Sequence, residues 1–411
     1  MLISFTVENF KSIRDLQTLS LEARSDTHLE ESHVIADGTT RLLKSVALFG
    51  PNASGKSNLA TAFVWFRRFV SNSSKEGQAG QPIDIDPFRL STTTENAPTH
   101  FEVEFLWNGY FYRYGFEVTR TAVESEWLYR RAKGASKTAL LFKRSGQDFD
   151  VSATLFKEGK GLNERTRANA LFLSVCAQWN GPVATEVMQW MNRLRILSGL
   201  SESGFFAFTA QQLQNPQYQE HLLQLARTAD FNITALRSEI DQTPNAKHKS
   251  MIKTSHQKHD ADGKPVGMVE FDLREDESQG TQKFIALAGP ISHTLEEGSI
   301  LVVDELEARL HPLLTQAIVA LFHSPANRHN AQLIFTTQDV LLMEPTFLRR
   351  DQIWFCEKDD QGATDLYTLA DFDPNQVRPT SKFSRQYLLG IFGAVPKLAH
   401  FEEAAADVAK E

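Results

Sequence analysis

Apolar side chains recur at every second position in several short stretches of the chain, which is the pattern of half-buried strands. Residues 3–7 are the first such stretch, and residues 16–21 predict a second strand. An Asn-Gly pair at 108–109 marks a hairpin turn further on. Around it we expect an antiparallel sheet built from residues 101–106, 110–116, 124–130 and 139–143. We interpret the aromatic residues of this sheet as a packed face, with a base-stacking platform as the alternative.

A different pattern begins at residue 45. Residues 45–49 form a mostly apolar run suited to a buried strand, and residues 58–69 carry apolar side chains at near-helical spacing. Residues 181–240 look largely helical, with one helix expected over 211–226 and no sustained heptad. We therefore expect an α/β fold with a compact helical insertion and no long coiled-coil arm.

The segment between this strand and its helix matches a phosphate-binding loop. The G-x-x-x-x-G-K-[ST] pattern is filled by Gly50, Pro51, Asn52, Ala53, Ser54, Gly55, Lys56 and Ser57, which we call the phosphate loop. Backbone N–H groups of such a loop and of the helix N-terminus face the phosphates of a nucleotide. We expect Lys56 to reach the β- and γ-phosphates and Ser57 to bind Mg²⁺. The alternative, a structural glycine turn, is disfavoured by the strand and helix around it.

A second aliphatic strand, residues 298–305, ends in two acids. The ends of buried parallel strands meet at one edge of a sheet, so Asp304 can hold Mg²⁺ together with Ser57. Glu305 is then placed to orient and deprotonate the water that attacks the γ-phosphate. An apolar run followed by Asp-Glu is common by itself, so this prediction depends on the phosphate loop.

Residues 277–283 join a serine and a glycine to the start of an apolar helix. Ser278 and Gly280, with Thr281 after them, would form a second anion-binding helix terminus. As a bare string, the segment is also consistent with an ordinary helix N-cap. Its position before the Asp-Glu strand favours a role in the nucleotide site.

Composition narrows the class of protein. The 411 residues carry a formal charge of −8 and 41% hydrophobic residues, which is ordinary for a soluble globular chain and excludes a generally basic nucleic-acid coat. No apolar run approaches the roughly 18 residues of a membrane span, and the N-terminus lacks a signal-peptide pattern. Cys176 and Cys356 have no C-x-x-C spacing, which predicts buried free thiols in a reducing compartment. We expect a cytoplasmic protein without a membrane partner.

One stretch is locally basic. Residues 247–264 contain five lysines and three histidines. Contact with phosphate or a nucleic-acid backbone is one interpretation. A solvated hairpin turning at Asp260, Asp262 and Gly263 is the other, and it is the one we favour. A histidine metal site is disfavoured because no ligand spacing is present.

The order of these motifs resembles an ABC-type ATPase head: phosphate loop, long insertion, Ser-x-Gly helix start, Asp-Glu strand, and a further strand at 333–337. The opening Asn9-Phe10-Lys11-Ser12 resembles the SMC and RecF-like branch of these ATPases. More narrowly, the chain resembles the AbiLi/RloA-like abortive-infection ATPases in residues 277–281, 304–307 with 310–312, 336–339, 351–355 and 387–396.

The resemblance implies an N-terminal lobe over residues 1–160, with the phosphate loop and a β-subdomain, a helical insertion over 161–245, and a C-terminal lobe over 246–411. It implies a head-to-tail homodimer, or a higher homo-oligomer, with ATP between the phosphate loop of one chain and Ser278 and Gly280 of the other. Residues 310–312 would lie at the dimer seam. It also implies an antiphage role with a separately encoded effector, a nuclease or toxin.

One residue departs from the family pattern. The family usually places a histidine after the Thr-Thr strand, where it contacts the γ-phosphate, whereas this chain has Gln338. Glutamine donates a hydrogen bond but cannot carry positive charge, so we expect slow hydrolysis of ATP to ADP and phosphate, with Glu305 and Gln338 as the catalytic residues.

Three rival assignments follow from the same sequence. A RecF-like DNA-repair ATPase that clamps DNA is the alternative function, with DNA as a further partner. An ABC transporter subunit fits the N-terminal strand and the insertion poorly. Residues 352–360 resemble the start of a Toprim nuclease, but we expect too few residues after them to complete that domain.

Overall fold

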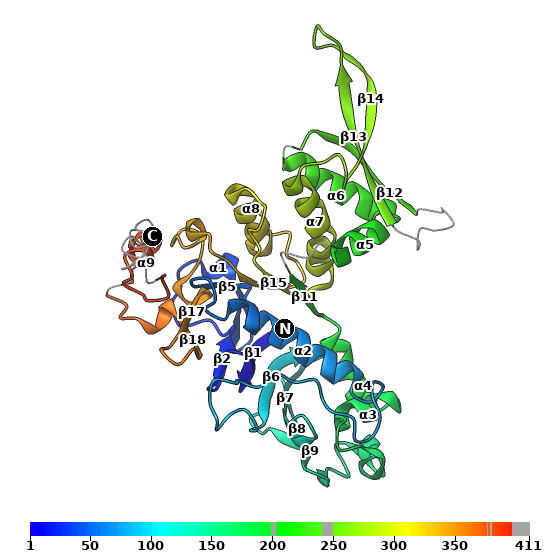
Figure 1. Cartoon of the computed structure of the whole chain (residues 1–411), viewed down its shortest axis with the longest axis vertical. Coiled ribbons are helices and arrows are strands. Elements are labelled where there is room, and N and C mark those ends of the chain that lie inside the picture. Colours follow the sequence, from blue (N-terminus) through cyan, green and yellow to red (C-terminus); the bar gives the residue numbers. More distant parts are fainter. Residues whose placement is uncertain (199–202, 230, 241–249, 376, 379, 397–411) are drawn as a thin grey trace, which may run out of the picture.

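The computed structural model describes residues 1–198, 203–229, 231–240, 250–375, 377–378 and 380–396. Within these ranges, two large sheets organise the chain (Figure 1). One is a six-stranded, mostly parallel sheet, and the other is a seven-stranded antiparallel sheet. Helix α2, Lys56–Asn72, begins beside the first sheet and packs along the second.

The parallel sheet has the strand order β11-β15-β16-β5-β17-β18, and only the last pair is antiparallel. Its strands are Leu194–Ser198, Ile300–Asp304, Gln332–Thr336, Ser45–Phe49, Ile353–Lys358 and Thr364–Thr368. Both faces are buried, which explains the unbroken aliphatic runs in the sequence. Val46 and Leu48 of β5 belong to the core under α2, whereas Ala47 and Phe49 belong to the core on the opposite face.

Helices cover this sheet on both faces. Helix α2 contacts β11 and β15 on one face. Helices α7, Gln279–Glu297, and α8, Pro312–His323, lie on the other face (Figure 1). The two hydrophobic cores are therefore separated by the sheet.

The antiparallel sheet has the order β10-β9-β8-β7-β6-β1-β2. Its strands are Asp148–Val151, Ala139–Ser145, Val123–Ala132, Tyr110–Val118, Thr99–Trp107, Leu2–Glu8 and Gln17–Ser20. The predicted hairpin is confirmed, with positive φ angles of 47° at Asn108 and 79° at Gly109. The aromatic residues form a packed face, as predicted: the Phe5 and Phe63 rings stack at 3.9 Å, and both are fully buried.

Residues 161–245, expected as a helical insertion, contain four helices among their described residues, and also strand β11 of the parallel sheet and strand β12, Ile233–Ile240. The helices are α3, Phe172–Gln178, α4, Pro182–Met191, α5, Ser203–Gln212, and α6, Pro216–Thr228. The single helix expected over 211–226 is wrong at its start, because Asn215 caps α6 and Pro216 occupies its first turn. The domain boundaries after residues 160 and 245 stay predictions.

A three-stranded sheet of β12, Ile233–Ile240, β13, Ser250–His259, and β14, Pro265–Asp272, stands beside α5 and α6. Its β13–β14 hairpin projects away from the body (Figure 1). The turn forms where the sequence predicted it, with Asp260 N donating to Lys264 O at 2.9 Å and Gly263 at φ 76°. Residues 257–270 are all exposed, as a solvated hairpin requires, whereas Lys247, His248 and Lys249 lie outside the described residues.

The shorter elements complete the described chain. They are α1, Glu30–His33, β3, Val34–Asp37, β4, Thr40–Leu43, and α9, Phe383–Leu388, with single 3₁₀ turns at Lys157–Gly159, Asn163–Arg165, Val340–Leu342, Arg350–Gln352 and Leu369–Asp371. Cys176 and Cys356 are buried free thiols, as predicted. Among the described helices, none combines the length and the apolar character that crossing a membrane takes.

Candidate nucleotide site

Three strands of the parallel sheet end side by side and carry the predicted nucleotide-site residues. Thr336 at the end of β16 pairs with Leu48 of β5, and Val303 of β15 pairs with Phe335. The phosphate loop leaves β5 here, and Asp304 is the last residue of β15. The sheet register, and not any local motif, thus brings the two predicted halves of the metal site together.

Two glycines of the phosphate loop are required by close packing. A Cβ on Gly55 would lie 2.0 Å from Thr364 Oγ1, and one on Gly50 would lie 2.3 Å from Cys356 O. Both have positive φ angles, 110° and 153°, which side chains disfavour. Gly55 is also the N-cap of α2, so the first N–H groups of that helix open onto the loop.

Thr364, from the start of β18, supports the loop from behind. Its hydroxyl donates to Ser54 O at 2.9 Å and lies 2.8 Å from Ser12 Oγ. Asn58 of α2 donates to the same Ser12 oxygen at 2.7 Å. The opening Asn-Phe-Lys-Ser motif therefore helps to hold the phosphate loop, which gives Ser12 a physical function in the site. Sequence reasoning missed Thr364, because it belongs to no motif.

Lys56 lies inside the loop. Its Nζ donates to Gly50 O at 2.7 Å and to Pro51 O at 3.0 Å, and the residue is buried. Burial lowers the pKa of Lys56, while the nearby carboxylates of Glu307, Asp304 and Glu305 act in the opposite direction. The ammonium is thus held at the loop by backbone carbonyls and faces a group of acids.

The predicted metal ligands are in contact. Ser57 Oγ donates to Asp304 Oδ1 at 3.1 Å, and Thr336 Oγ1 donates to the same oxygen at 2.7 Å. Hydroxyl and carboxylate oxygens are the donors that Mg²⁺ prefers, so Ser57 and Asp304 fit this ion. Among the described residues, no cluster of three or more His, Cys, Asp or Glu side chains could hold a metal. An ion held by Ser57 and Asp304 would take water and phosphate oxygens as its other ligands.

Glu305 follows in a left-handed backbone conformation, with φ 55°. Its N–H donates to Thr336 Oγ1 at 2.7 Å, and its carbonyl accepts from Ala308 N at 3.1 Å. A non-glycine residue in this conformation costs free energy and persists only where neighbours hold it, often at functional sites. The Thr336 hydroxyl thus fixes both Asp304, through its side chain, and Glu305, through its backbone.

Gln338 joins the phosphate loop to the segment after Asp304. Its Nε2 donates to Asn52 Oδ1 at 2.8 Å, and its backbone N–H donates to Glu307 Oε1 at 2.6 Å. Asn52 was predicted only as a member of the loop pattern, and Glu307 was not predicted as a site residue. The structure places both beside the position where the family pattern expects histidine.

In the signature segment, residues 277–281, Ser278 and Thr281 make their hydrogen bonds at the start of α7. Ser278 is the N-cap of α7, and its Oγ accepts from Thr281 N at 3.2 Å and lies 2.8 Å from Thr281 Oγ1. A Cβ on Gly280 would lie 3.1 Å from Arg309 O, so the segment packs against the turn after Glu307. Within the part of the chain that the structure describes, no hydrogen bond joins residues 278–281 to the phosphate loop.

Glu277, just before the cap, links the signature segment to the small sheet. Its Oε1 accepts from Thr254 Oγ1 at 2.5 Å and lies 2.6 Å from His256 Nε2. Both partners belong to β13, the strand that continues into the projecting hairpin. Nothing in the sequence pattern signalled this contact.

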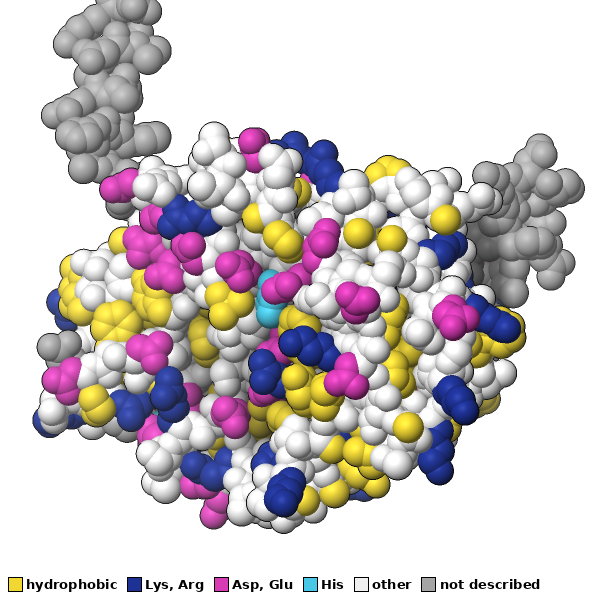
Figure 2. Space-filling model, turned by 90° about the horizontal axis from the view of Figure 1, so that it is seen from below, with side chains coloured by type: hydrophobic (Ala, Val, Ile, Leu, Met, Phe, Trp, Pro, Cys, Tyr) yellow, Lys and Arg dark blue, Asp and Glu magenta, His cyan; other side chains and the backbone are white. Residues whose placement is uncertain are grey.

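Two surface features lie away from these residues. Figure 2 shows a face on which lysine and arginine alternate with acidic and apolar side chains, without a field of one sign.

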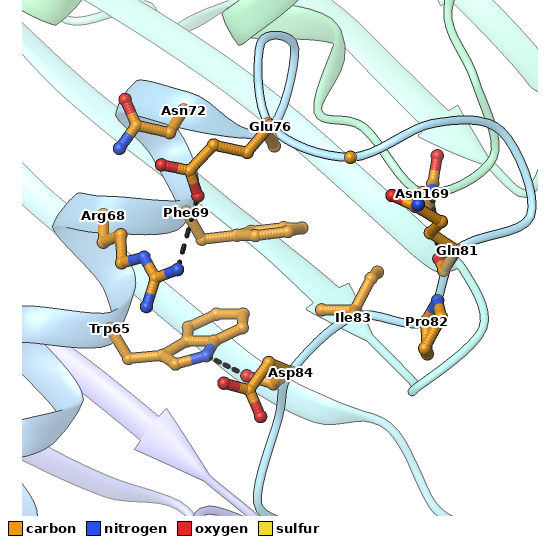
Figure 3. Close-up of a pocket in the computed structure, with 12 residues that line it drawn as sticks. Trp65, Arg68, Phe69, Asn72, Glu76, Gln81, Pro82, Ile83, Asp84 and Asn169 are labelled. Carbon is orange, nitrogen blue, oxygen red and sulfur yellow. Dashed lines mark hydrogen bonds and ion pairs between the residues drawn. The ribbon is translucent and has the colours of Figure 1, made fainter.

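Figure 3 shows a cavity of about 160 Å³ beside the second half of α2, where Trp65 and Phe69 face Ile83 and Arg68 pairs with Glu76 at 3.4 Å. This cavity contains none of the predicted site residues.

The strand order, the phosphate loop and the acids at the neighbouring strand end define an ABC-type P-loop ATPase head. The family model described as "AAA domain, putative AbiEii toxin, Type IV TA system" matches residues 45–344. The chain therefore belongs to this family. In a comparison with curated proteins, no match was found.

Solved structures similar to this chain include three SMC heads. The SMC head domain from Thermotoga maritima has 14% identity, covers 89% of this chain and 98% of its own, and gives a TM-score of 0.42. An SmcHead bound to the C-winged helix domain of ScpA has 12% identity, coverage of 89% and 97%, and a TM-score of 0.47. An Smc head with an extended coiled coil, bound to the C-terminal domain of ScpA derived from Pyrococcus furiosus, has 11% identity, coverage of 89% and 96%, and a TM-score of 0.42.

Proposed function

We propose that this protein is an ATP-binding and ATP-hydrolysing switch of an antiphage, abortive-infection system, acting with a separately encoded effector. The observation that carries the ATPase assignment is the bonded set of Ser57, Asp304 and Thr336 beside Lys56. The antiphage assignment is supported by the AbiLi/RloA-like motifs and by the matched family, whose description names a putative AbiEii toxin.

In this proposal, each site residue acts on one part of the nucleotide. The phosphate loop and Lys56 bind the phosphates, and Ser57 and Asp304 hold Mg²⁺, which when bound neutralises charge on the phosphate oxygens. Glu305 orients the attacking water and takes its proton. Gln338 donates a hydrogen bond toward the γ-phosphate, without the positive charge of a histidine, so hydrolysis is slow.

The signature segment supports a homodimer. Ser278, Gly280 and Thr281 are not bonded to the phosphate loop of their own chain, so we propose that they complete the site of a second copy. ATP then joins two heads, and hydrolysis separates them. Residues 310–312 are proposed to lie at this seam, where the exposed Leu313 follows them.

Glu305→Gln tests the proposal. The variant should bind ATP, hydrolyse it at least about a hundredfold more slowly, and accumulate as an ATP-dependent dimer in light-scattering measurements. Turnover at the wild-type rate would show that Glu305 is not the base. Retrieval of the same variant with ATP from its native host, followed by identification of the proteins bound to it, tests for the effector.

The RecF-like alternative has less support in the described residues. Lys253 is paired with Asp272 at 3.2 Å, and the exposed Lys258 and Lys264 stand among the acids of the hairpin turn. Salt-dependent DNA binding that is abolished by charge reversal at Lys249, Lys253 and Lys258 would favour this alternative.

A further inference from the structure

Glu307 is an acid of the site to which neither the sequence analysis nor the proposed reaction assigns a role. It lies three residues after Asp304, and its Oε1 accepts the backbone N–H of Gln338 at 2.6 Å. The backbone of Gln338, the residue at the family's histidine position, is therefore held by one side chain.

The second oxygen of Glu307 is unusual. Oε2 is buried and has no hydrogen-bond partner among the described residues. A buried carboxylate oxygen without a partner is costly, so such groups are rare unless the site uses them. Burial accordingly raises the pKa of Glu307, although the Gln338 N–H opposes this shift. The Glu307 carboxylate also acts on Lys56, in the direction that raises the pKa of this ammonium.

Gln338 is thus held at two points with different strengths. Its backbone is bonded to a carboxylate, which makes a stronger hydrogen bond than a neutral acceptor. Its side-chain amide is bonded to the neutral amide oxygen of Asn52, at 2.8 Å. A γ-phosphate oxygen is a charged acceptor and competes favourably for that same N–H group. The side-chain contact can therefore exchange while the backbone contact stays.

We propose that Glu307 is a positioning residue that fixes Gln338 so that its amide exchanges Asn52 for the γ-phosphate of ATP. Glu307 itself does not touch the nucleotide. When ATP is bound, the Gln338 amide leaves Asn52 of the phosphate loop and bonds to the γ-phosphate. ADP has no γ-phosphate, so Gln338 stays bonded to Asn52, and the site distinguishes the two nucleotides through Gln338. This inference rests on the proposed function, because it assigns the ATP sensor of the same site.

The test is the preference for ATP over ADP, measured as the ratio of the two dissociation constants by calorimetry in Mg²⁺. The wild type should prefer ATP, and Gln338→Ala should reduce this preference about tenfold, as expected for one hydrogen bond to a charged group. Glu307→Ala should reduce it similarly, with little change in the affinity for ADP. Glu307→Gln keeps an acceptor oxygen for the Gln338 N–H and should restore the preference to within about threefold of the wild type.

A double-mutant cycle separates positioning from a direct contact. If Glu307 acts through Gln338, then Glu307→Ala in the Gln338→Ala background should cause no further loss. Additive losses would overturn the proposal, and so would a Glu307→Gln variant as impaired as Glu307→Ala.

Glu158 provides a matched control for folding. It is also an acid whose pKa burial raises, and its Oε1 accepts a backbone N–H, from Ala184 at 2.8 Å. Glu158→Ala should lower the melting temperature without changing the ATP preference. An equal loss of preference in this control would show that the effect at Glu307 is structural. ATP hydrolysis by the wild type is measured separately, so its absence would refute the proposed function and leave the sensor test intact.

Discussion

The phosphate loop and the signature segment are the two parts of the proposed nucleotide site, and a single chain assembles them to different degrees. Around the phosphate loop, hydrogen bonds connect four separate segments, from Ser12 to Thr364 and from Ser57 to Asp304. In the signature segment, the hydrogen bonds of Ser278 among the described residues lie within its own helix start, and Glu277 bonds to β13. Contacts from several segments therefore hold the phosphate loop in place. The signature segment is instead linked to the sheet that carries the projecting hairpin.

The difference has a physical cause. The loop exposes backbone N–H groups of a helix start whose N-cap is glycine, so no side chain of the cap satisfies them. The start of α7 is capped by Ser278, and its N–H group at Thr281 is already bonded. A phosphate at α7 must displace a cap worth about 1 kcal/mol, whereas at α2 it displaces no side-chain cap.

The largest expected effect is at the phosphate loop. Lys56→Ala should lower the affinity for ATP at least about a hundredfold, because it removes a buried cation from the proposed phosphate site. Lys44 is the control, since burial also lowers its pKa but it precedes β5, at the opposite end of that strand. Fluorescent-nucleotide titration measures both variants. Normal ATP binding by Lys56→Ala would contradict the assignment of the phosphate loop as the nucleotide-binding part.

The next largest effect is expected at Ser278, where a substitution should change turnover without changing nucleotide binding at the phosphate loop. Ser278→Asp keeps a side chain that caps α7 but places negative charge against a phosphate. We expect turnover to fall about a hundredfold while each monomer binds ATP as before. Ser278→Asn keeps the cap without the charge and should stay closer to the wild type. Equal loss of turnover and of monomer binding in Ser278→Asp would contradict completion of the site by a second chain.

A smaller effect is expected behind the loop. Thr364→Val preserves shape but removes the hydroxyl that bonds Ser54 O, and it should weaken ATP binding about fivefold to tenfold. Thr368→Val is a matched control on the same strand, because Thr368 Oγ1 donates to Ile353 O at 3.0 Å, away from the loop. Both variants should lose about 1–2 kcal/mol of unfolding free energy in urea. Only the first should change nucleotide affinity.

The smallest effect concerns the link to the small sheet. His256→Ala removes one of the two β13 partners of Glu277 and should change turnover only about twofold to fivefold, because Thr254 remains. Affinity for ATP should be unaffected. Steady-state ATPase assays and nucleotide titrations measure the two quantities. Unchanged turnover in a His256→Ala, Thr254→Val double variant would show that the signature segment is independent of β13.

Local patterns in the sequence determined much of this molecule. The alternation of residues 3–7 and the Asn-Gly pair at 108–109 specify strands and a turn through neighbouring residues alone, and the structure has both. The phosphate loop is also a local motif, because its glycines and Lys56 lie within eight residues. Asp304 and Glu305 could be placed at a strand end because an aliphatic run predicts where a buried strand stops.

Only the tertiary structure shows which segments distant in the sequence contact these motifs. Strand β11 joins the parallel sheet from within a region of helical pattern, and α5 and α6 separate at Asn215 because a cap and a proline outweigh the apolar periodicity. Thr364 and the His256–Glu277 contact have no periodic or motif signal, and the motif that contains Glu307 does not show its bond to Gln338. Each of these residues depends on a partner that the sheet register or the strand ends bring near. A local stretch of sequence cannot predict such long-range contacts.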